Sequence, residues 1–422
     1  MFTLQSARFN QLLILKILHY ITATVHNVEI IDKLLDVKSV YQGKIDMCIV
    51  VANQLPPKKN DNNIIFINGN GTKPYNIFTI QRRFLQVLYT YMPDIVHIHG
   101  AWSYLSYKVI KWCLIRDFLI AYSPHGQLNS NILNSNFWRH KFPRILYYQR
   151  AMARNSNAII VEDTTEMEQL KKLGWNRRID IVSSESEPIS AVMSYHTIYQ
   201  KIIDSNVLHF MSINDYEALS SLLRSGVNEG YKPRQLSADA ILNLRNINPV
   251  AYQRISLFAS DLLCLDIVER GVVNNQLALR IIDADAIVRY PLKRSKSSLP
   301  LSDNELIQGN KYIYNILNNR IKSSEEIIRK LCIQLINIRH LVNDDNVSLS
   351  HLASLYERMR KSDIDEERFA DVLKALGILQ FARRIIQILH EFFYMEWGFM
   401  PIAPLDDKGT EKIRRVIITI KR

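Results

Sequence analysis

The sequence is poor in glycine. Thirteen of its 422 residues are glycine, about 3% where proteins average ~7%. Six of them lie before residue 175, and the 248 residues that follow share the other seven. Enzymes that grip nucleotide phosphates usually do so with glycine-rich loops at helix N-termini. The composition therefore argues against such a loop, above all in the second half of the chain.

Clustered cysteines are lacking too. The sequence holds no CxxC pair and no cluster of cysteine with histidine, so it supports neither a disulfide framework nor a zinc site. Isolated cysteines fit the reducing cytoplasm, where we expect to find the protein. The four are Cys48, Cys113, Cys264 and Cys332.

Long apolar runs are also absent. No stretch of 18 apolar residues occurs, so we expect no membrane-spanning helix. The short apolar run Leu12–Leu15 meets Lys16, and no small-residue cleavage site follows, so we expect no signal peptide. Apolar residues make up 47% and charged residues 22% of the chain. These ordinary values exclude a disordered or low-complexity protein.

The charge is positive and uneven. The chain carries +12 in total. Residues 1–190 hold 22 basic and 14 acidic side chains, or +8, and the remainder holds 31 and 27, or +4. A basic first half is typical of a protein with an anionic partner, and equally of one whose charge serves solubility.

Residues 11–160 alternate between apolar runs and amphipathic segments. This alternation predicts an α/β fold, a Rossmann-like parallel sheet with helices on both faces, over about residues 1–190. The expected strands are Leu12–Tyr20, Met47–Val51, Ile64–Ile67, Asp94–His99, Phe118–Ser123 and Ala158–Val161. The expected helices are Asn27–Leu35, Gln81–Tyr91, Ser103–Ile115 and Phe142–Arg154.

The pattern changes after residue 190. Amphipathic helical segments dominate there, namely Asp215–Arg224, Ala251–Glu269 and Ser324–Leu341 among others. We expect a mainly α-helical second half, with helical regions over 191–290 and 304–422. Tyr290–Asn304 is rich in Ser, Pro and Lys and is expected to be the linker between them.

Two signals refine the C-terminal region. Gly377 lies where a helix that starts near Asp365 should end, so it is expected to cap that helix. Phe381–Phe399 is strongly apolar and aromatic. It is expected to be a packed helix, with a partner-binding helix as the alternative.

Polar residues follow three of the predicted strands, at the sheet edge where parallel sheets bind ligands. His97 and His99 share one face of the first of these strands, and a buried structural role is favoured for His97 and left open for His99. His125 lies beside a glycine after the next strand and is placed to reach a ligand. The three segments are Asp94–Ser103 (DIVHIHGAWS), Ser123–Leu128 (SPHGQL) and Val161–Glu166 (VEDTTE).

These segments resemble the N-terminal domain of family 4 glycosyltransferases. The family pattern D-[IV]-[VI]-H-x-H-G-x-W fits Asp94–Trp102, and S-P-H-G-x-L fits Ser123–Leu128. A basic segment, Arg139-His140-Lys141, and the pattern E-x-E-x-L-x-x-L-G at Glu166–Gly174 follow in the family's order.

The resemblance implies half of a GT-B enzyme, a retaining and metal-independent hexosyltransferase of polysaccharide biosynthesis. Such an enzyme passes a sugar from a nucleotide sugar to a saccharide or lipid-linked acceptor. No cofactor is expected, because basic groups and helix N-termini stabilise the diphosphate. The catalytic role near the transferred sugar is implied for His125. Substrate binding is implied for His99, Gly100, Trp102, Gly126, Arg139, Lys141 and Glu166.

The segment Arg139–Arg154 holds five basic residues and no acid. Its apolar side is expected to consist of Phe142, Ile145, Leu146 and Met152. A basic amphipathic helix is typical of docking on an anionic membrane surface, here the inner face, and equally of a solvated helix that covers a sheet. Nucleic acid is not an expected partner, because no aromatic–basic interleaving accompanies the charge.

The chain also departs from the family. Thr22–His26 stands where the family has a Gly-Gly loop, and Glu162-Asp163-Thr164 where it has Thr-Ser-Glu. No two glutamates after residue 190 lie eight positions apart, although the family's donor domain uses such a pair. Asp283-Ala284-Asp285 only weakly resembles a metal-binding DxD motif. A second hypothesis is therefore a non-catalytic interaction protein whose helical half is a partner platform.

Overall fold

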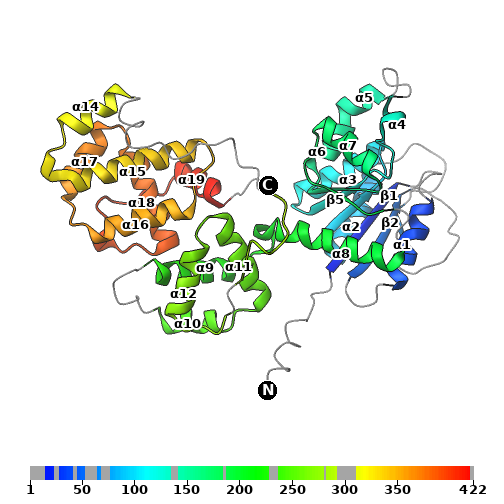
Figure 1. Cartoon of the computed structure of the whole chain (residues 1–422), viewed down its shortest axis with the longest axis horizontal. Coiled ribbons are helices and arrows are strands. Elements are labelled where there is room, and N and C mark those ends of the chain that lie inside the picture. The colour runs from blue at the N-terminus through cyan, green and yellow to red at the C-terminus, as the bar shows by residue number, and fades with distance from the viewer. Residues whose placement is uncertain are drawn as a thin grey trace. The chain divides into compact units, whose positions relative to one another are not determined.

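The computed structural model describes residues 15–22, 28–40, 45–52, 64–67, 77–134, 141–183, 187–227, 236–279, 282–291 and 310–418. The contacts within it divide the chain into two units, Met1–Ile203 and Asp204–Arg422. The first runs from blue to green in Figure 1 and the second from green to red. Each unit encloses a hydrophobic core of its own.

A sheet of seven parallel strands forms the first unit, in the order β3-β2-β1-β4-β5-β6-β7. Because the order reverses between β1 and β4, a ligand crevice is expected outside the carboxyl ends of these two strands. The strands are β1 (Leu15–Thr22), β2 (Ile45–Ala52), β3 (Ile64–Phe66), β4 (Ile95–His99), β5 (Leu119–Ser123), β6 (Ala158–Val161) and β7 (Ile179–Ile181).

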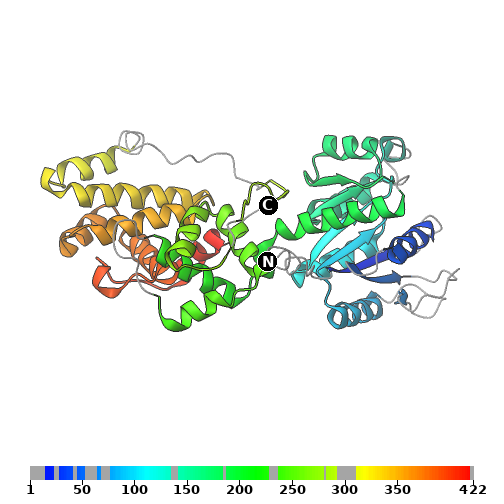
Figure 2. The ribbon, with the colours of Figure 1, turned by 60° about the horizontal axis from the view of Figure 1, so that its bottom comes forward.

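Helices cover both faces of this sheet (Figures 1 and 2). They are α1 (Val28–Val40), α2 (Ile77–Tyr91), α3 (Tyr104–Ile115), α4 (Ser130–Asn134), α5 (Phe142–Arg144), α6 (Arg150–Asn155), α7 (Thr164–Leu173) and α8 (Pro188–Asp204). A π-helical turn, Ile145–Gln149, joins α5 to α6.

Both faces are buried, which explains why the strands are near-continuous apolar runs in the sequence. Alternate strand residues point to opposite faces. Tyr20 and Ile98 belong to the core that also holds Phe84 of α2 and Ile110 of α3. On the other face, Ile21 packs with residues of α1. The histidines of β1 and β4 lie on that second face.

The structure confirms the predicted fold class, a Rossmann-like parallel sheet followed by a mainly helical half. Ala158–Val161 is found with the predicted bounds, and the predicted helix Phe142–Arg154 is found as the run from α5 to α6. Strand β7 was not predicted, because it is three residues long and has Asp180 at its centre. So short a polar segment carries no strand signal.

The described residues of the second unit contain helices and no strand. The helices are α9 (Ile213–Gly226), α10 (Ala238–Arg245), α11 (Pro249–Asp261), α12 (Leu265–Asn274), α14 (Lys311–Asn319), α15 (Glu326–Asn343), α16 (Leu349–Lys361), α17 (Glu366–Ala375), α18 (Leu379–Phe393) and α19 (Lys408–Ile418). Short 3₁₀ turns lie at Val207–Phe210, Ser323–Glu325 and Trp397–Phe399.

Two glycines let helices α9 and α12 touch backbone to backbone. A Cβ built on Gly226 lies 1.8 Å from the carbonyl oxygen of Ile267, and one on Gly271 lies 2.2 Å from that of Leu222. Both distances are far below any allowed contact, so neither position accepts a side chain while the helices keep this crossing.

Helix ends in the second unit follow two kinds of signal. Gly377 has φ +67° directly after the C-cap of α17, as predicted. The predicted helical segment Ala251–Glu269 is instead two helices, because Leu263 between them adopts φ +56°. Neither glycine nor proline marks that break in the sequence. Helix α18 forms the predicted packed helix as far as Phe393.

The DxD sequence in this unit belongs to a turn. The Asp283 carboxylate accepts hydrogen bonds from the backbone N–H groups of Asp285 and Ala286, at 3.1 and 3.2 Å. This is the ordinary turn-forming role of aspartate. Most of the predicted linker Tyr290–Asn304, from residue 292 on, lies outside the described residues.

Candidate functional site

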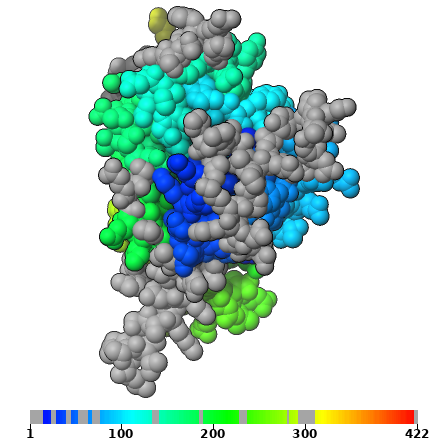
Figure 3. All heavy atoms as spheres, turned by 90° about the vertical axis from the view of Figure 1, so that its right-hand side faces the viewer, coloured from blue at the N-terminus to red at the C-terminus, as the bar shows by residue number. Residues whose placement is uncertain are grey.

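A pocket opens at the carboxyl edge of the sheet in the first unit. It spans about 690 Å³, including space that is open to solvent. Helix α1 lies on the surface of this unit (Figure 3) and forms one wall. Helix α8 and the ends of β4, β5 and β6 form the others. The lining residues are Ile30, Lys33, Leu34, Asp36, Val37, His99, His125, Glu162, Val182, Ser183, Ala191 and Tyr195.

His125 enters the pocket on a loop with an uncommon backbone. It adopts φ +54°, and Gly126 follows with φ +72°. Left-handed conformations are costly for residues other than glycine and concentrate at functional sites. Glu166 on α7 holds this loop, because its two carboxylate oxygens accept from the N–H groups of Gly126 (2.9 Å) and Leu128 (3.1 Å).

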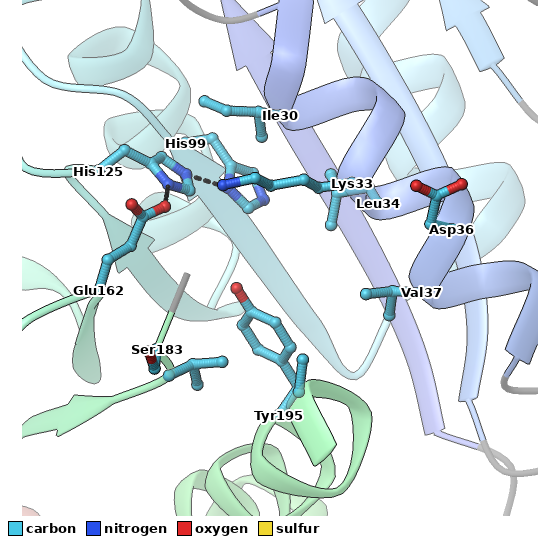
Figure 4. Close-up of a pocket in the computed structure, with 12 residues that line it drawn as sticks. Ile30, Lys33, Leu34, Asp36, Val37, His99, His125, Glu162, Ser183 and Tyr195 are labelled. Carbon is cyan, nitrogen blue, oxygen red and sulfur yellow. Dashed lines mark hydrogen bonds and ion pairs between the residues drawn. The ribbon is translucent and has the colours of Figure 1, made fainter. Parts of the chain in front are cut away.

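A chain of hydrogen bonds runs from the pocket into the sheet. Glu162 Oε1 lies 2.7 Å from His125 Nδ1. His125 Nε2 lies 2.8 Å from His99 Nδ1, and His99 Nε2 lies 2.8 Å from His19 Nδ1. Figure 4 shows the first two of these links at the pocket wall. The third leads to a histidine that is only 1% exposed.

His97 forms a second, separate network beneath the pocket. Its Nδ1 lies 2.7 Å from the hydroxyl of Tyr199 on α8, and its Nε2 lies 2.7 Å from Ser123 Oγ. The His97 side chain is fully buried. The buried position expected for it from the sequence is the one the structure shows.

Charges of opposite sign meet at the pocket wall. The hydrogen bond with His125 lowers the pKa of the Glu162 carboxyl, the Lys33 charge lowers it further, and burial opposes both. In Figure 4 the Lys33 side chain reaches from α1 toward His99 and His125, and Tyr195 points its hydroxyl into the same space from α8. Burial raises the pKa of that hydroxyl, so it stays protonated and can donate a hydrogen bond.

The pocket gathers some of the predicted site residues. His99 and His125 line it, while Gly126 belongs to the loop behind it and Glu166 holds that loop from α7. Glu166 is fully buried, so its carboxylate faces backbone rather than the pocket. Burial raises the pKa of Glu166 to about 7, although its two backbone hydrogen bonds oppose the rise.

The other predicted residues lie around the neighbouring loop. Gly100 donates its N–H to the Ser123 carbonyl at 2.8 Å, and the Trp102 indole donates to the Gln127 carbonyl at 3.0 Å. Lys141 Nζ lies 5.9 Å above the Trp102 ring. Arg139 lies outside the described residues.

Sequence reasoning missed several residues of the site. His19 joins it because the β1–β4 register places it opposite His97, and no local pattern encodes that pairing. Tyr195 and Tyr199 come from α8, about 100 residues away along the chain. The two tyrosines are four residues apart, so they lie on one face of the helix. This spacing was the sequence signal that could have pointed to them. Glu162 stood at a predicted strand end, where ligands of such sheets bind.

The predicted basic segment forms the surface run of α5, the π-helical turn and α6. Met152 is buried against the sheet, whereas Leu146 and Tyr147 are 63% and 79% exposed. Arg144 and Arg150, which flank them, are exposed too. Among the described residues, no helix is both long and apolar enough to cross a membrane.

No family model matches the sequence, and no curated protein matches it either. Matches among solved structures include UDP-N-acetylglucosamine 2-epimerases and MnaA from S. aureus. The one from Rickettsia bellii is 14% identical over 56% of this chain and 66% of its own, with a TM-score of 0.31. Another is 10% identical over 65% of this chain and 94% of its own, also with a TM-score of 0.31. A UDP co-structure of MnaA from S. aureus is 12% identical over 56% of this chain and 66% of its own, with a TM-score of 0.29.

Proposed function

We propose that the first unit is the sugar-binding half of a retaining glycosyltransferase of polysaccharide biosynthesis. The observation that carries the proposal is the hydrogen-bonded pair of Glu162 and His125, which faces a pocket at the carboxyl ends of parallel strands. His125 stands in the loop Ser123–Leu128, which matches the family motif. Parallel sheets of this topology bind their ligands at this edge.

The pocket offers groups that suit the transferred sugar and an adjoining phosphate. Glu162 is 30% exposed, so one carboxylate oxygen can accept from a sugar hydroxyl while the other holds His125. Lys33 supplies positive charge for a phosphate. Because both ring nitrogens of His125 have partners, His125 orients the carboxylate and presents its ring to the sugar. A hydroxyl reaches its Nε2 only after His99 moves.

Calorimetry on the full-length protein with a panel of nucleotide sugars tests this proposal. We expect one of them to bind. Because a hydrogen bond to a charged group contributes about 1.5–3 kcal/mol, Glu162→Gln should weaken that binding by about 10- to 100-fold. Glu168→Gln, on the exposed side of α7, is the matched control and should bind as the wild type does. The proposal fails if no nucleotide sugar binds and His125→Ala leaves sugar incorporation in cell extracts unchanged.

A non-catalytic interaction protein is the second candidate. It is favoured by the second unit, whose described residues form helices and no sheet of the kind that binds a donor. Transfer or hydrolysis of a donor by the purified chain alone would exclude it. A purified partner that forms a stable complex equally with wild type and His125→Ala, in the absence of any donor binding, would support it.

We propose that the surface of α5–α6 docks on an anionic membrane. Leu146 and Tyr147 are the exposed apolar residues, and Arg144 and Arg150 supply the charge. Such a surface combines apolar insertion with attraction to acidic lipids. The full chain should therefore sediment with phosphatidylglycerol vesicles and not with phosphatidylcholine vesicles. Arg144→Glu with Arg150→Glu should abolish sedimentation; equal sedimentation of this variant would refute the docking.

A further inference from the structure

Three buried histidines meet at the point where the strand order of the sheet reverses. His19 on β1 pairs in register with His97 on β4, and His99 follows two residues later on the same face. One ring nitrogen of each lies within 4.8 Å of one ring nitrogen of each of the others. The ring centroids of His97 and His99 are 4.0 Å apart, and those of His19 lie 5.2 and 5.1 Å from them.

The chain of hydrogen bonds assigns the ring protons. An ionised carboxylate can only accept, so His125 donates its Nδ1–H to Glu162. When His125 carries only that proton, its Nε2 accepts from His99 Nδ1–H. His99 in turn accepts at Nε2 from His19 Nδ1–H. This order leaves an unprotonated nitrogen, with its lone pair, at Nε2 of both His99 and His19.

The last of these nitrogens has no partner. His19 Nε2 is buried and forms no hydrogen bond with any described residue. A buried polar atom without a partner destabilises the folded state, so its persistence calls for a ligand. All three histidines are buried, with His19 and His99 1% exposed and His97 0% exposed, and imidazole binds metals in its neutral form.

The surroundings supply the outer contacts that metal-binding histidines need. Such histidines usually give their second ring nitrogen to a carboxylate, a carbonyl or another polar group. Here His99 Nδ1 is bonded to His125, which Glu162 holds, and His97 Nδ1 is bonded to Tyr199. These partners fix the ring orientations from the side facing away from the cluster.

We propose that His19, His97 and His99 bind one divalent transition-metal ion of the zinc class. Neutral imidazole suits Zn²⁺, Co²⁺, Ni²⁺ and Cu²⁺, whereas Mg²⁺ and Ca²⁺ prefer oxygen ligands. The resemblance behind the proposed sugar transfer implies no metal, so this ion is a property beyond that function. His99 also lines the pocket, so the pocket gives the ion a way in.

Binding requires a small rearrangement. His99 Nε2 accepts from His19 Nδ1–H at 2.8 Å, so it can bind the ion only when this hydrogen bond breaks and His19 turns its own Nε2 toward the cluster. The ion therefore replaces the His19–His99 hydrogen bond, and one of the two hydrogen bonds of His97 opens. In return it joins β1 to β4 and locks His99 against His125.

Cobalt is the probe for the test, since tetrahedral Co²⁺ has intense visible absorption. Tag-free full-length protein, stripped with a chelator, should take up one Co²⁺ per chain with that spectrum and release it to Zn²⁺. His19→Asn should weaken Co²⁺ binding by at least 100-fold. His125→Ala, which removes the hydrogen-bond partner of His99 Nδ1, should weaken it by about 10- to 100-fold, the usual effect of losing an outer partner. His340→Asn, on α15 in the second unit, is the matched control and should bind as the wild type does.

Two results would overturn the proposal. One is an octahedral, non-saturating Co²⁺ spectrum of the wild type. The other is wild-type affinity in a His19→Asn variant whose circular dichroism shows that it is folded. If that variant does not fold, X-ray absorption of the zinc-loaded wild type decides, because three imidazole ligands are expected and one or none refutes the site. Neither readout depends on whether a nucleotide sugar binds.

Discussion

The carboxylate of Glu166 is the support on which the His125 loop depends. Glu166→Ala removes the acceptor of two backbone N–H groups, those of Gly126 and Leu128. A buried donor left without a partner costs about 1–3 kcal/mol. Leu128 is fully buried while Gly126 is partly accessible to water, so we expect a loss of about 2–4 kcal/mol in the free energy of unfolding. Glu166→Gln keeps one acceptor oxygen and should lose about half as much.

Urea unfolding followed by tryptophan fluorescence measures this loss. Four of the five tryptophans belong to the first unit, and a Trp397→Phe background removes the fifth. The midpoint of the first unit should fall without a change of slope. Glu168→Ala, exposed on the same helix, should stay within about 0.5 kcal/mol of the wild type. An equal effect of Glu166→Ala and Glu168→Ala would refute the supporting role.

The same carboxyl gives this stability a pH dependence. Burial raises the pKa of Glu166 to about 7 in the folded chain, from 4.5. Between these values the folded state holds a proton that the unfolded chain has released, so stability falls as pH rises from 4.5 to 7. The fall amounts to up to roughly 3 kcal/mol. The free energy of unfolding of the wild type minus that of Glu166→Gln, measured from pH 4.5 to 7, isolates the contribution of this carboxyl. A difference that stays flat or rises with pH would contradict the raised pKa.

Three further predictions concern packing and backbone. Gly271→Ala should destabilise the second unit by about 2 kcal/mol or more in thermal unfolding, because its Cβ meets a backbone carbonyl that cannot move aside. Gly398→Ala is the control, since its Cβ meets nothing within 4 Å. Equal melting temperatures of these two variants would contradict the close crossing of α9 and α12. Tyr199→Phe should lower the free energy of unfolding of the first unit by about 1–3 kcal/mol in urea, since it leaves a buried nitrogen of His97 unpaired. An unchanged urea midpoint would show that water replaces the hydroxyl. Leu263→Asn should raise the stability of the second unit by about 0.5–1 kcal/mol in thermal unfolding, because asparagine tolerates the left-handed backbone that leucine is forced to adopt there. A lower melting temperature would mean that the packing of the half-exposed leucine side chain stabilises the unit by more than the backbone strain destabilises it.

The alternation of the first half was sufficient to predict its fold. Apolar runs of four to eight residues ended by turn signals are the mark of a buried parallel strand, and β6 matched its predicted bounds. The break at Leu263 could not be predicted, since a leucine in the left-handed region leaves no trace in composition. Strand β7 was too short to show a period.

The candidate site was only partly visible in the sequence. His99 and His125 were predicted because each ends a strand in a matched motif. His19 was not, because its place beside His97 depends on the pairing of β1 with β4, which lie almost 80 residues apart. Tyr199 reaches the cluster from a helix beyond the last strand. Contacts that depend on register and on tertiary packing carry no local periodicity.

The glycine pair at the crossing of α9 and α12 has a consequence for how this sequence can change over time. At each of these glycines the main chain of the opposite helix occupies the space that a side chain would need. A smaller neighbouring side chain therefore cannot make room for a residue other than glycine. Apolar positions of a helical core, by contrast, exchange freely among similar volumes. In distant relatives Gly226 and Gly271 should therefore persist together, 45 positions apart, after the surrounding residues have diverged. In a chain with thirteen glycines, that spaced pair is a better signature for recognising the second unit than its hydrophobic pattern.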